Sequence, residues 1–135
     1  MGRLRNWILI FTSAFVLNFI WENIHSVLYV HYKFGPIAQV ILLHATLVDA
    51  SIITISIFTL TQFPKIRKRM PWVVVVWWLV LAILIEQWAL ATNRWAYTNA
   101  MPIIPVIYVG LTPTIQLALT GWVVYSLFCR NKNTI

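Results

Sequence analysis

The stretch that decides the fold is Trp72–Ala91, which reads WVVVVWWLVLAILIEQWALA and holds a single charged residue, Glu86. An α-helix of about 20 residues rises about 30 Å, enough to cross the hydrocarbon core of a bilayer. Comparable apolar runs lie on either side of it, at about 7–30, 37–60 and 104–128. The sequence therefore predicts an all-α, polytopic membrane four-helix bundle that forms one domain over residues 1–135.

The composition supports a membrane protein. Hydrophobic residues make up 61% of the chain and charged residues 10%, whereas soluble domains carry about a quarter charged residues. The three acidic residues lie inside apolar segments, and the ten Lys and Arg lie almost wholly at segment ends. The net charge of +7 therefore reports topology and attraction to anionic lipid. It does not indicate a nucleic-acid partner.

The basic residues also predict the orientation. Eight of them fall on one side of the four spans: Arg3, Arg5, Lys65, Arg67, Lys68, Arg69, Arg130 and Lys132. Only Lys33 and Arg94 fall on the other side. Because basic residues concentrate in cytoplasmic loops, we expect both termini to be cytoplasmic and the protein to lie in the cell inner (cytoplasmic) membrane. The N-terminal run is too long for a signal peptide and shows no cleavage site, so it is expected to be a retained span.

Prolines and glycines mark the breaks between spans. Gly35-Pro36 separates the first two, with Pro36 expected at the first position of the second helix. Before the last span, two interpretations remain open. In one, residues 103–111 form an irregular or re-entrant segment, and Thr112-Pro113 caps and starts the last helix. In the other, a kinked helix begins near Ile104.

Polar residues recur on one face of the first span. At about 100° per residue, Asn18, Glu22, His25 and Tyr29 fall within roughly 60° of one another. Carboxylate and imidazole groups are costly inside a membrane and are therefore expected to have partners. The predicted topology places His44, Glu86 and the start of a Thr112, Gln116, Thr120 ridge at the same outer depth.

Two interpretations fit this convergence. The first is an outward-facing polar pocket lined by Glu22, His25, His44, Glu86, Gln116 and Arg94. The second is a set of buried hydrogen bonds that staple the helices together. Burying ionisable groups inside a membrane costs free energy that uncharged hydrogen-bonding groups would not, which favours the pocket. Asp49 lies about 140° around its helix from His44 and is expected to face a different seam, together with Ser56.

The pocket interpretation assigns roles to its residues. Glu22, Glu86 and His25 are the candidate catalytic acid–base groups. The candidate ligand-binding residues are Asn18, His44, Arg94, Trp95, Tyr97, Thr112 and Gln116. A single zinc or iron ion held by Glu22, His25, His44 and Glu86 is chemically reasonable, although the chain lacks the second Glu-x-x-His pair of di-iron bundles. Cys129 is expected to be an inert thiol.

Several motifs carry a resemblance. They are Trp21-Glu22-Asn23-x-His25, Arg94-Trp95-x-Tyr97, and Val109-Gly110-Leu111-Thr112-Pro113 followed by Gln116. Together they resemble a family of small prokaryotic four-helix membrane proteins, which implies the same fold and no particular activity. More distantly, the Trp-x-Tyr after a Glu-bearing helix is similar to the membrane lycopene cyclase domains of carotenoid synthesis. Those domains have an acidic pair where this chain has Pro113, Thr114 and Gln116.

Three functions follow from these observations, with enzymatic activity left open. The preferred one is the binding of an isoprenoid or lipid in the outer pocket, with its transformation by Glu/His acid–base or metal chemistry as an extension. The second is a small proton- or cation-coupled transporter, and the third is a non-catalytic subunit of a larger membrane complex. The expected partners are membrane lipid, a hydrophobic small molecule, and either a second copy of the chain or another membrane protein.

Overall fold

A computed structural model of the chain describes residues 2–67 and 69–130. Its elements are α1 (Gly2–His25), a 3₁₀ turn (Ser26–Leu28), β1 (Tyr29–Tyr32), α2 (Gln39–Thr61), α3 (Pro64–Arg67), α4 (Met70–Ala91), β2 (Trp95–Tyr97), β3 (Ile103–Ile104), β4 (Val109–Gly110) and α5 (Leu111–Phe128). Four of the helices, α1, α2, α4 and α5, are long and apolar enough to cross a membrane. The predicted number of membrane-length helices is confirmed, consistent with a multi-pass membrane protein.

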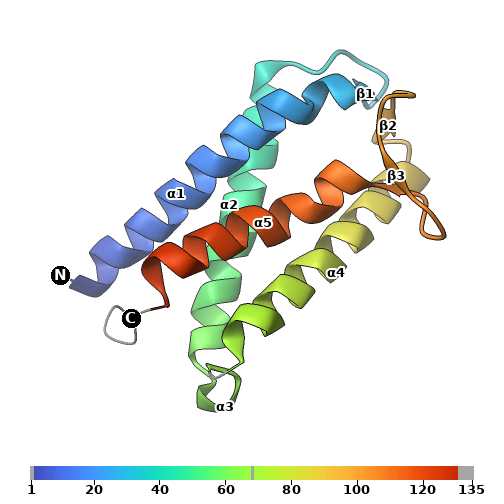
Figure 1. Cartoon of the computed structure of the whole chain (residues 1–135). Helices are drawn as coiled ribbons and strands as arrows, with labels where there is room; N and C mark the ends of the chain where they lie inside the picture. Colours follow the sequence, from blue (N-terminus) through green and yellow to red (C-terminus); the bar gives the residue numbers. More distant parts are fainter. Residues whose placement is uncertain (1, 68, 131–135) are drawn as a thin grey trace.

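The two ends of the four-helix bundle carry different elements (Figure 1). The N-terminus, α3 and the end of α5 lie at one end of the bundle, and the strands lie at the other. We call these the terminal end and the strand end. Lys68 and Lys132, two of the basic residues used to predict orientation, lie outside the described residues.

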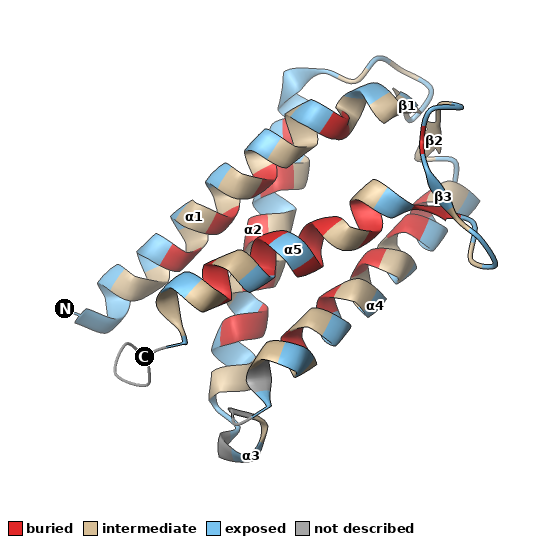
Figure 2. Cartoon of the chain, in the orientation of Figure 1, coloured by how far each residue is buried: buried red, intermediate tan, exposed pale blue. Residues whose placement is uncertain are grey.

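Helix α5 is the most enclosed of the four long helices. Half of its residues are buried inside the bundle, a larger share than in the membrane-length segments of α1, α2 or α4. Helix α5 packs closely on α1 and on α4, and α1 also packs on α2. Helix α2 packs only weakly on α4. Figure 2 shows buried positions along most of α5, whereas on α1 single buried positions alternate with exposed and partly buried ones. The helices therefore follow the order α2, α1, α5, α4, with a weakly packed seam between α2 and α4.

The apolar core lies in the half of the bundle next to the terminal end. Trp78 of α4 is fully buried there, and a Cβ atom added to Gly121 of α5 would lie 2.6 Å from the Trp78 ring. Only glycine permits this close approach of α5 to the indole ring. The core also contains Ile10, Ile53, Ile57, Val74 and Val124.

The strand end departs from the purely helical prediction. β1 pairs with β2 in antiparallel fashion, with Tyr32 opposite Trp95, and β3 pairs with β4. Helix α1 therefore ends at His25, short of the predicted limit near Val30, because the aromatic and β-branched residues that follow form strand contacts. Pro36 lies in an extended segment before α2 and not at its first helical position.

Residues 103–110 form the β3–β4 hairpin, so the last helix begins at Leu111 and not near Ile104. Val106 and Tyr108 have positive φ angles, which a continuous α-helix excludes. Thr112 is also not the N-cap, a position held by Gly110. Pro113 falls in the first turn of α5, where a missing N–H costs no intrahelical hydrogen bond.

Candidate functional site

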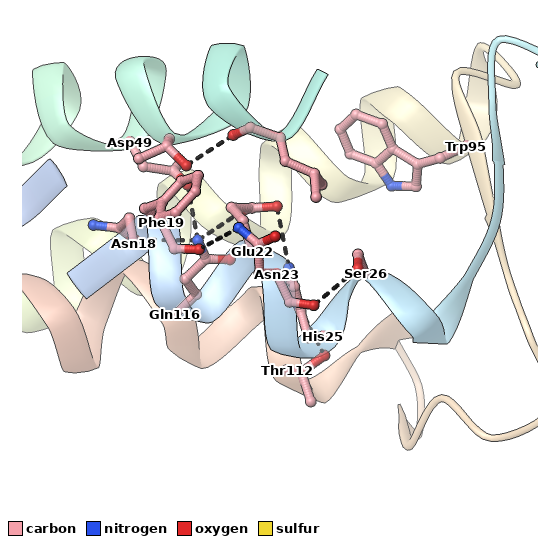
Figure 3. Close-up of polar contacts among 12 residues, drawn as sticks. Asn18, Phe19, Glu22, Asn23, His25, Ser26, Asp49, Trp95, Thr112 and Gln116 are labelled. Carbon is pink, nitrogen blue, oxygen red and sulfur yellow. Dashed lines mark hydrogen bonds and ion pairs between the residues drawn. The ribbon is translucent and has the colours of Figure 1, made fainter. Parts of the chain in front are cut away.

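A polar cluster centred on Gln116 joins three helices in the half of the bundle next to the strands. The Gln116 Nε2 atom lies 2.8 Å from both Glu22 Oε1 of α1 and Asp49 Oδ2 of α2, and 3.1 Å from Asn18 Oδ1. Figure 3 shows these side chains converging on the amide. One amide nitrogen therefore donates to groups on α1 and α2 from its position on α5.

The Gln116 amide is surrounded by more acceptors than it has hydrogens. It carries two N–H bonds, and three oxygens lie within hydrogen-bond distance of it. The nearest oxygens of Glu22 and Asp49 are consequently within twice 2.8 Å of each other. This brings two carboxyl groups into one apolar site, where two negative charges would repel strongly.

Asn18 and Thr120 extend the cluster deeper into the bundle. Asn18 is fully buried, donates to the Ala14 carbonyl over 2.8 Å and accepts from the Thr120 hydroxyl over 3.2 Å. Asn18 thus holds Gln116 in place and lies behind it.

His25 connects α1 to the start of α5. Its Nε2 atom lies 3.3 Å from Glu22 Oε2 and its Nδ1 atom 3.3 Å from Thr112 Oγ1. The Tyr29 ring packs edge-on against the imidazole, with 5.3 Å between ring centroids. Since both ring nitrogens have partners and the side chain is buried, His25 is fixed in orientation beside the Glu22 carboxyl.

Glu86 forms a separate acidic group on α4. Its Oε2 atom accepts hydrogen bonds from Trp95 Nε1, at 3.1 Å, and from the Tyr97 hydroxyl. The Tyr97 oxygen in turn accepts from the Gly110 backbone N–H at 3.0 Å. The carboxyl group therefore links α4 to β2 and, through Tyr97, to the residue that caps α5.

Tyr29 of β1 lines the same cavity as Glu22, Asp49 and Glu86. Its burial and the nearby Glu86, followed by Tyr97, Glu22 and Asp49, raise the pKa of Tyr29 well above the usual value of a phenol. Burial and Glu86 likewise raise the pKa of Tyr97. Both hydroxyls therefore remain protonated at neutral pH, and that of Tyr97 donates to the Glu86 carboxyl.

These groups border a cavity of about 730 Å³. Its polar lining is Glu22, His25, Ser26, Tyr29, His31, Tyr32, Lys33, His44, Asp49, Glu86, Trp88, Arg94, Trp95 and Gln116. Its apolar lining is Ile37, Val40, Ile41, Leu42, Ala45, Val48, Ala82, Ile85, Pro113 and Leu117. Five of these apolar residues come from α2, and two each come from α4 and α5. The cavity is therefore bordered by all three helices and includes the weakly packed seam between α2 and α4.

The cavity brings together most of the residues expected to form a site. Glu22, His25, His44, Glu86, Arg94, Trp95 and Gln116 all line it. Three other candidates lie behind the lining and contact it. Asn18 bonds Gln116, Tyr97 bonds Glu86, and Thr112 contacts His25.

The prediction that Asp49 faces a different seam from His44 is wrong. Both residues line the same cavity, and Asp49 accepts a hydrogen bond from Gln116. The cavity borders a broad face of α2, so an angular separation of about 140° does not divide the two residues. Ser56, expected beside Asp49, instead accepts from Trp77 Nε1 at 3.2 Å.

Lys33 and Tyr29 were not among the predicted site residues. Tyr29 shares the helical periodicity of Asn18 and Glu22, so the sequence pattern could have identified it as a site residue. Lys33 carried no signal of its own, because its proximity to the site depends on the pairing of β1 with β2.

The predicted metal ligands are not arranged around one point. Within residues 2–67 and 69–130, no group of three or more His, Cys, Asp or Glu side chains is placed to hold a metal ion. Glu22 and His25 contact each other, but Glu86 is bonded to Trp95 and Tyr97. The four-residue zinc or iron site is therefore not formed by this arrangement.

The chain matches no protein-family model, no curated protein and no solved structure. The resemblances to small prokaryotic four-helix membrane proteins and to lycopene cyclase domains accordingly stay predictions.

Proposed function

We propose that the protein binds a hydrophobic small molecule, an isoprenoid or a lipid, in the cavity between α2 and α4. The observation that carries this proposal is a cavity of about 730 Å³ whose lining combines aliphatic and aromatic side chains with convergent polar groups. Small-molecule sites have volumes of about 300–1,000 Å³ and are lined by apolar and aromatic side chains together with polar groups that fix the ligand. Hydrogen bonds that only hold the helices together would not require an empty volume beside them.

In this proposal the polar groups act on the ligand by acid–base chemistry. The carboxyl groups of Glu22 and Asp49 both accept from the Gln116 amide and line the cavity, so either can exchange a proton with a ligand bound there. His25, 3.3 Å from Glu22, accepts or returns that proton. Glu86 is the second acid–base group, on the opposite helix.

We also propose that both termini are cytoplasmic, in the inner membrane, and that the cavity and the β3–β4 hairpin lie in the outer half of the bilayer. The support is the positive charge gathered at the terminal end. A membrane-impermeant maleimide tests this on intact cells with Val106→Cys and Lys65→Cys, both made in a Cys129→Ala background. Val106→Cys is expected to react, since Val106 is 86% exposed, and Lys65→Cys only after lysis. The reverse pattern would invert the topology.

The binding proposal is tested by mass spectrometry of lipids extracted from protein purified from its own membrane. Wild-type protein is expected to carry a specific lipid or isoprenoid. Ala45→Trp, which fills the cavity, is expected to lose it. Leu47→Trp is the matched control on the same helix, because Leu47 is exposed and outside the cavity. Identical lipid profiles in all three proteins would reject the proposal.

The acid–base step has its own test. Glu22→Gln and Glu86→Gln keep side-chain size while removing the carboxyl group. Each variant is expected to retain the bound molecule and to change the ratio of unmodified to modified species in the extract. An unchanged ratio in both variants, with the protein still folded, would restrict the function to binding.

A further inference from the structure

The two basic residues of the strand end lie next to each other although they are distant in the sequence. Just beyond the pair Tyr32 and Trp95, the Lys33 backbone N–H donates to the Arg94 carbonyl oxygen. This contact holds two basic residues side by side at the end of the β1–β2 pair. An anion bound by both would offset the repulsion between their positive charges.

Within the part of the chain that the structure describes, no acidic side chain forms an ion pair with Lys33 or Arg94. Among residues 2–67 and 69–130, the one ion pair joins His25 and Glu22. The guanidinium of Arg94 instead lies 4.3 Å from the centre of the Trp88 ring, and Lys33 Nζ lies 5.4 Å from the centre of the Tyr32 ring. A guanidinium stacked on an indole keeps its N–H edge available for a carboxylate or phosphate.

Both cations also border two adjoining cavities. A smaller cavity of about 300 Å³ is lined by Lys33, Phe34, Trp88, Thr92, Asn93 and Arg94. Lys33, Trp88 and Arg94 line the larger cavity as well. The shared residues form a rim, so a ligand in the larger cavity would place one end at the two cations.

The larger cavity extends from the two cations along α2. Lys33 and Arg94 lie next to the ends of β1 and β2, and aliphatic side chains of α2, among them Ile41, Ala45 and Val48, line the cavity farther along the helix. Asp49, which also lines it, lies ten residues after the start of α2 at Gln39, about 15 Å along the helix axis. This arrangement matches an amphiphile with an anionic head and an apolar chain.

We propose that the rim formed by Lys33, Trp88 and Arg94 binds the phosphate of an anionic amphiphile whose chain occupies the larger cavity. The proposal rests on the proposed ligand-binding function and specifies its ligand class. The same phosphate chemistry is offered by a free prenyl phosphate and by a membrane phospholipid with an exposed phosphomonoester head.

The test compares two probes with the same chain, farnesyl phosphate and farnesol, on wild-type protein in phosphatidylcholine nanodiscs. Binding is followed by tryptophan fluorescence, because Trp88 and Trp95 line the cavity. We expect farnesyl phosphate to bind about tenfold tighter or more, the usual gain from charge-assisted hydrogen bonds. Arg94→Gln is expected to remove that preference by weakening the binding of farnesyl phosphate. Lys33→Gln is expected to reduce it severalfold, and Lys65→Gln, at the terminal end, is the charge-matched control.

Nanodiscs that contain phosphatidic acid distinguish the two sources. Competition with farnesyl phosphate identifies a membrane lipid as a ligand of the rim, and absence of competition identifies the free prenyl phosphate. Equal affinities for farnesol and farnesyl phosphate, unaffected by Arg94→Gln, would overturn the rim site, as would no binding of either phosphate.

The cavity-filling variant separates this failure from failure of the proposed function. If Ala45→Trp abolishes farnesol binding while the phosphate preference is missing, the cavity binds apolar molecules and only the rim proposal fails. If Ala45→Trp leaves the binding of both probes unchanged, the cavity is not the binding site and both proposals fail.

Discussion

Near the terminal end the helices pack around Trp78, with Gly121 pressed against its ring, whereas near the strand end they converge on the Gln116 amide. The first half is closed by van der Waals contact. The second is held by hydrogen bonds, and it leaves a cavity of about 730 Å³. The comparison indicates that the two halves have different roles. The packed apolar half stabilises the fold, and the hydrogen-bonded polar half contains the empty volume that a ligand needs.

The largest expected effect is in the apolar half. Trp78→Ala should lower the free energy of unfolding by about 3–5 kcal/mol, because it leaves a cavity in a packed core. The measurement is the midpoint of thermal unfolding in detergent. Trp72→Ala is the control on the same helix, since Trp72 is 77% exposed, and equal losses in the two variants would contradict the proposed packing.

Gly121→Ala tests the same contact from α5. The added methyl group would meet the Trp78 ring at 2.6 Å, and overpacking of this kind costs about 1–3 kcal/mol. The cost should fall markedly in a Trp78→Leu background, where the ring is absent. Additive effects of the two substitutions would show that the contact does not limit stability.

The next effect is in the polar half. Gln116→Leu keeps the side-chain size but removes the donor shared by Glu22, Asp49 and Asn18, and should cost about 1–2 kcal/mol. Gln87→Leu is the matched control, because Gln87 is exposed on α4. A loss as large as that of Trp78→Ala would mean that the polar half, and not the apolar half, dominates stability.

Much of this comparison follows from the sequence. Apolar runs of about 20 residues predict the four helices, and the placement of Glu22, His25, His44 and Glu86 at one depth predicts a shared polar region. These inferences use properties that accumulate over many residues, namely hydropathy and helical periodicity.

The strand end was harder to predict for physical reasons. The segments Tyr29–Tyr32 and Trp95–Tyr97 are too short, and too uniformly aromatic or apolar, for a strand period to be distinguished from a helical one. Their pairing is what brings Lys33 beside Arg94. The position of Asp49 was missed because helix phase gives the direction of a side chain but not the width of the cavity it borders.

A smaller effect is expected from alkaline pH, again in the polar half. Since the pKa values of Tyr29 and Tyr97 are raised in the folded protein, the unfolded chain releases these phenolic protons first, above about pH 10. The folded state then binds more protons, so its stability should fall as pH rises, by at most about 1.4 kcal/mol per pH unit for each phenol. Thermal unfolding between about pH 9 and pH 11 should show a shallower fall for Tyr29→Phe. Tyr108→Phe is the control, with Tyr108 75% exposed, and identical slopes in all three proteins would contradict the placement of Tyr29.

The smallest effect leaves stability unchanged and compares chemical access to the two halves. Cys129 packs against the apolar core, and burial raises the pKa of its thiol to about 12. The thiolate is the reactive form, so N-ethylmaleimide should label Cys129 slowly at neutral pH and about tenfold faster for each unit of pH increase.

Ala45→Cys in a Cys129→Ala background presents a thiol to the cavity instead and should react rapidly, because a small neutral reagent enters the larger cavity. Arg130→Cys in the same background gives the rate of an exposed thiol next to the native one. If Cys129 reacted as fast as Arg130→Cys, the terminal end would be open to solutes. If Ala45→Cys were as slow as Cys129, the seam between α2 and α4 would be closed, and the contrast between the two halves would be one of polarity alone.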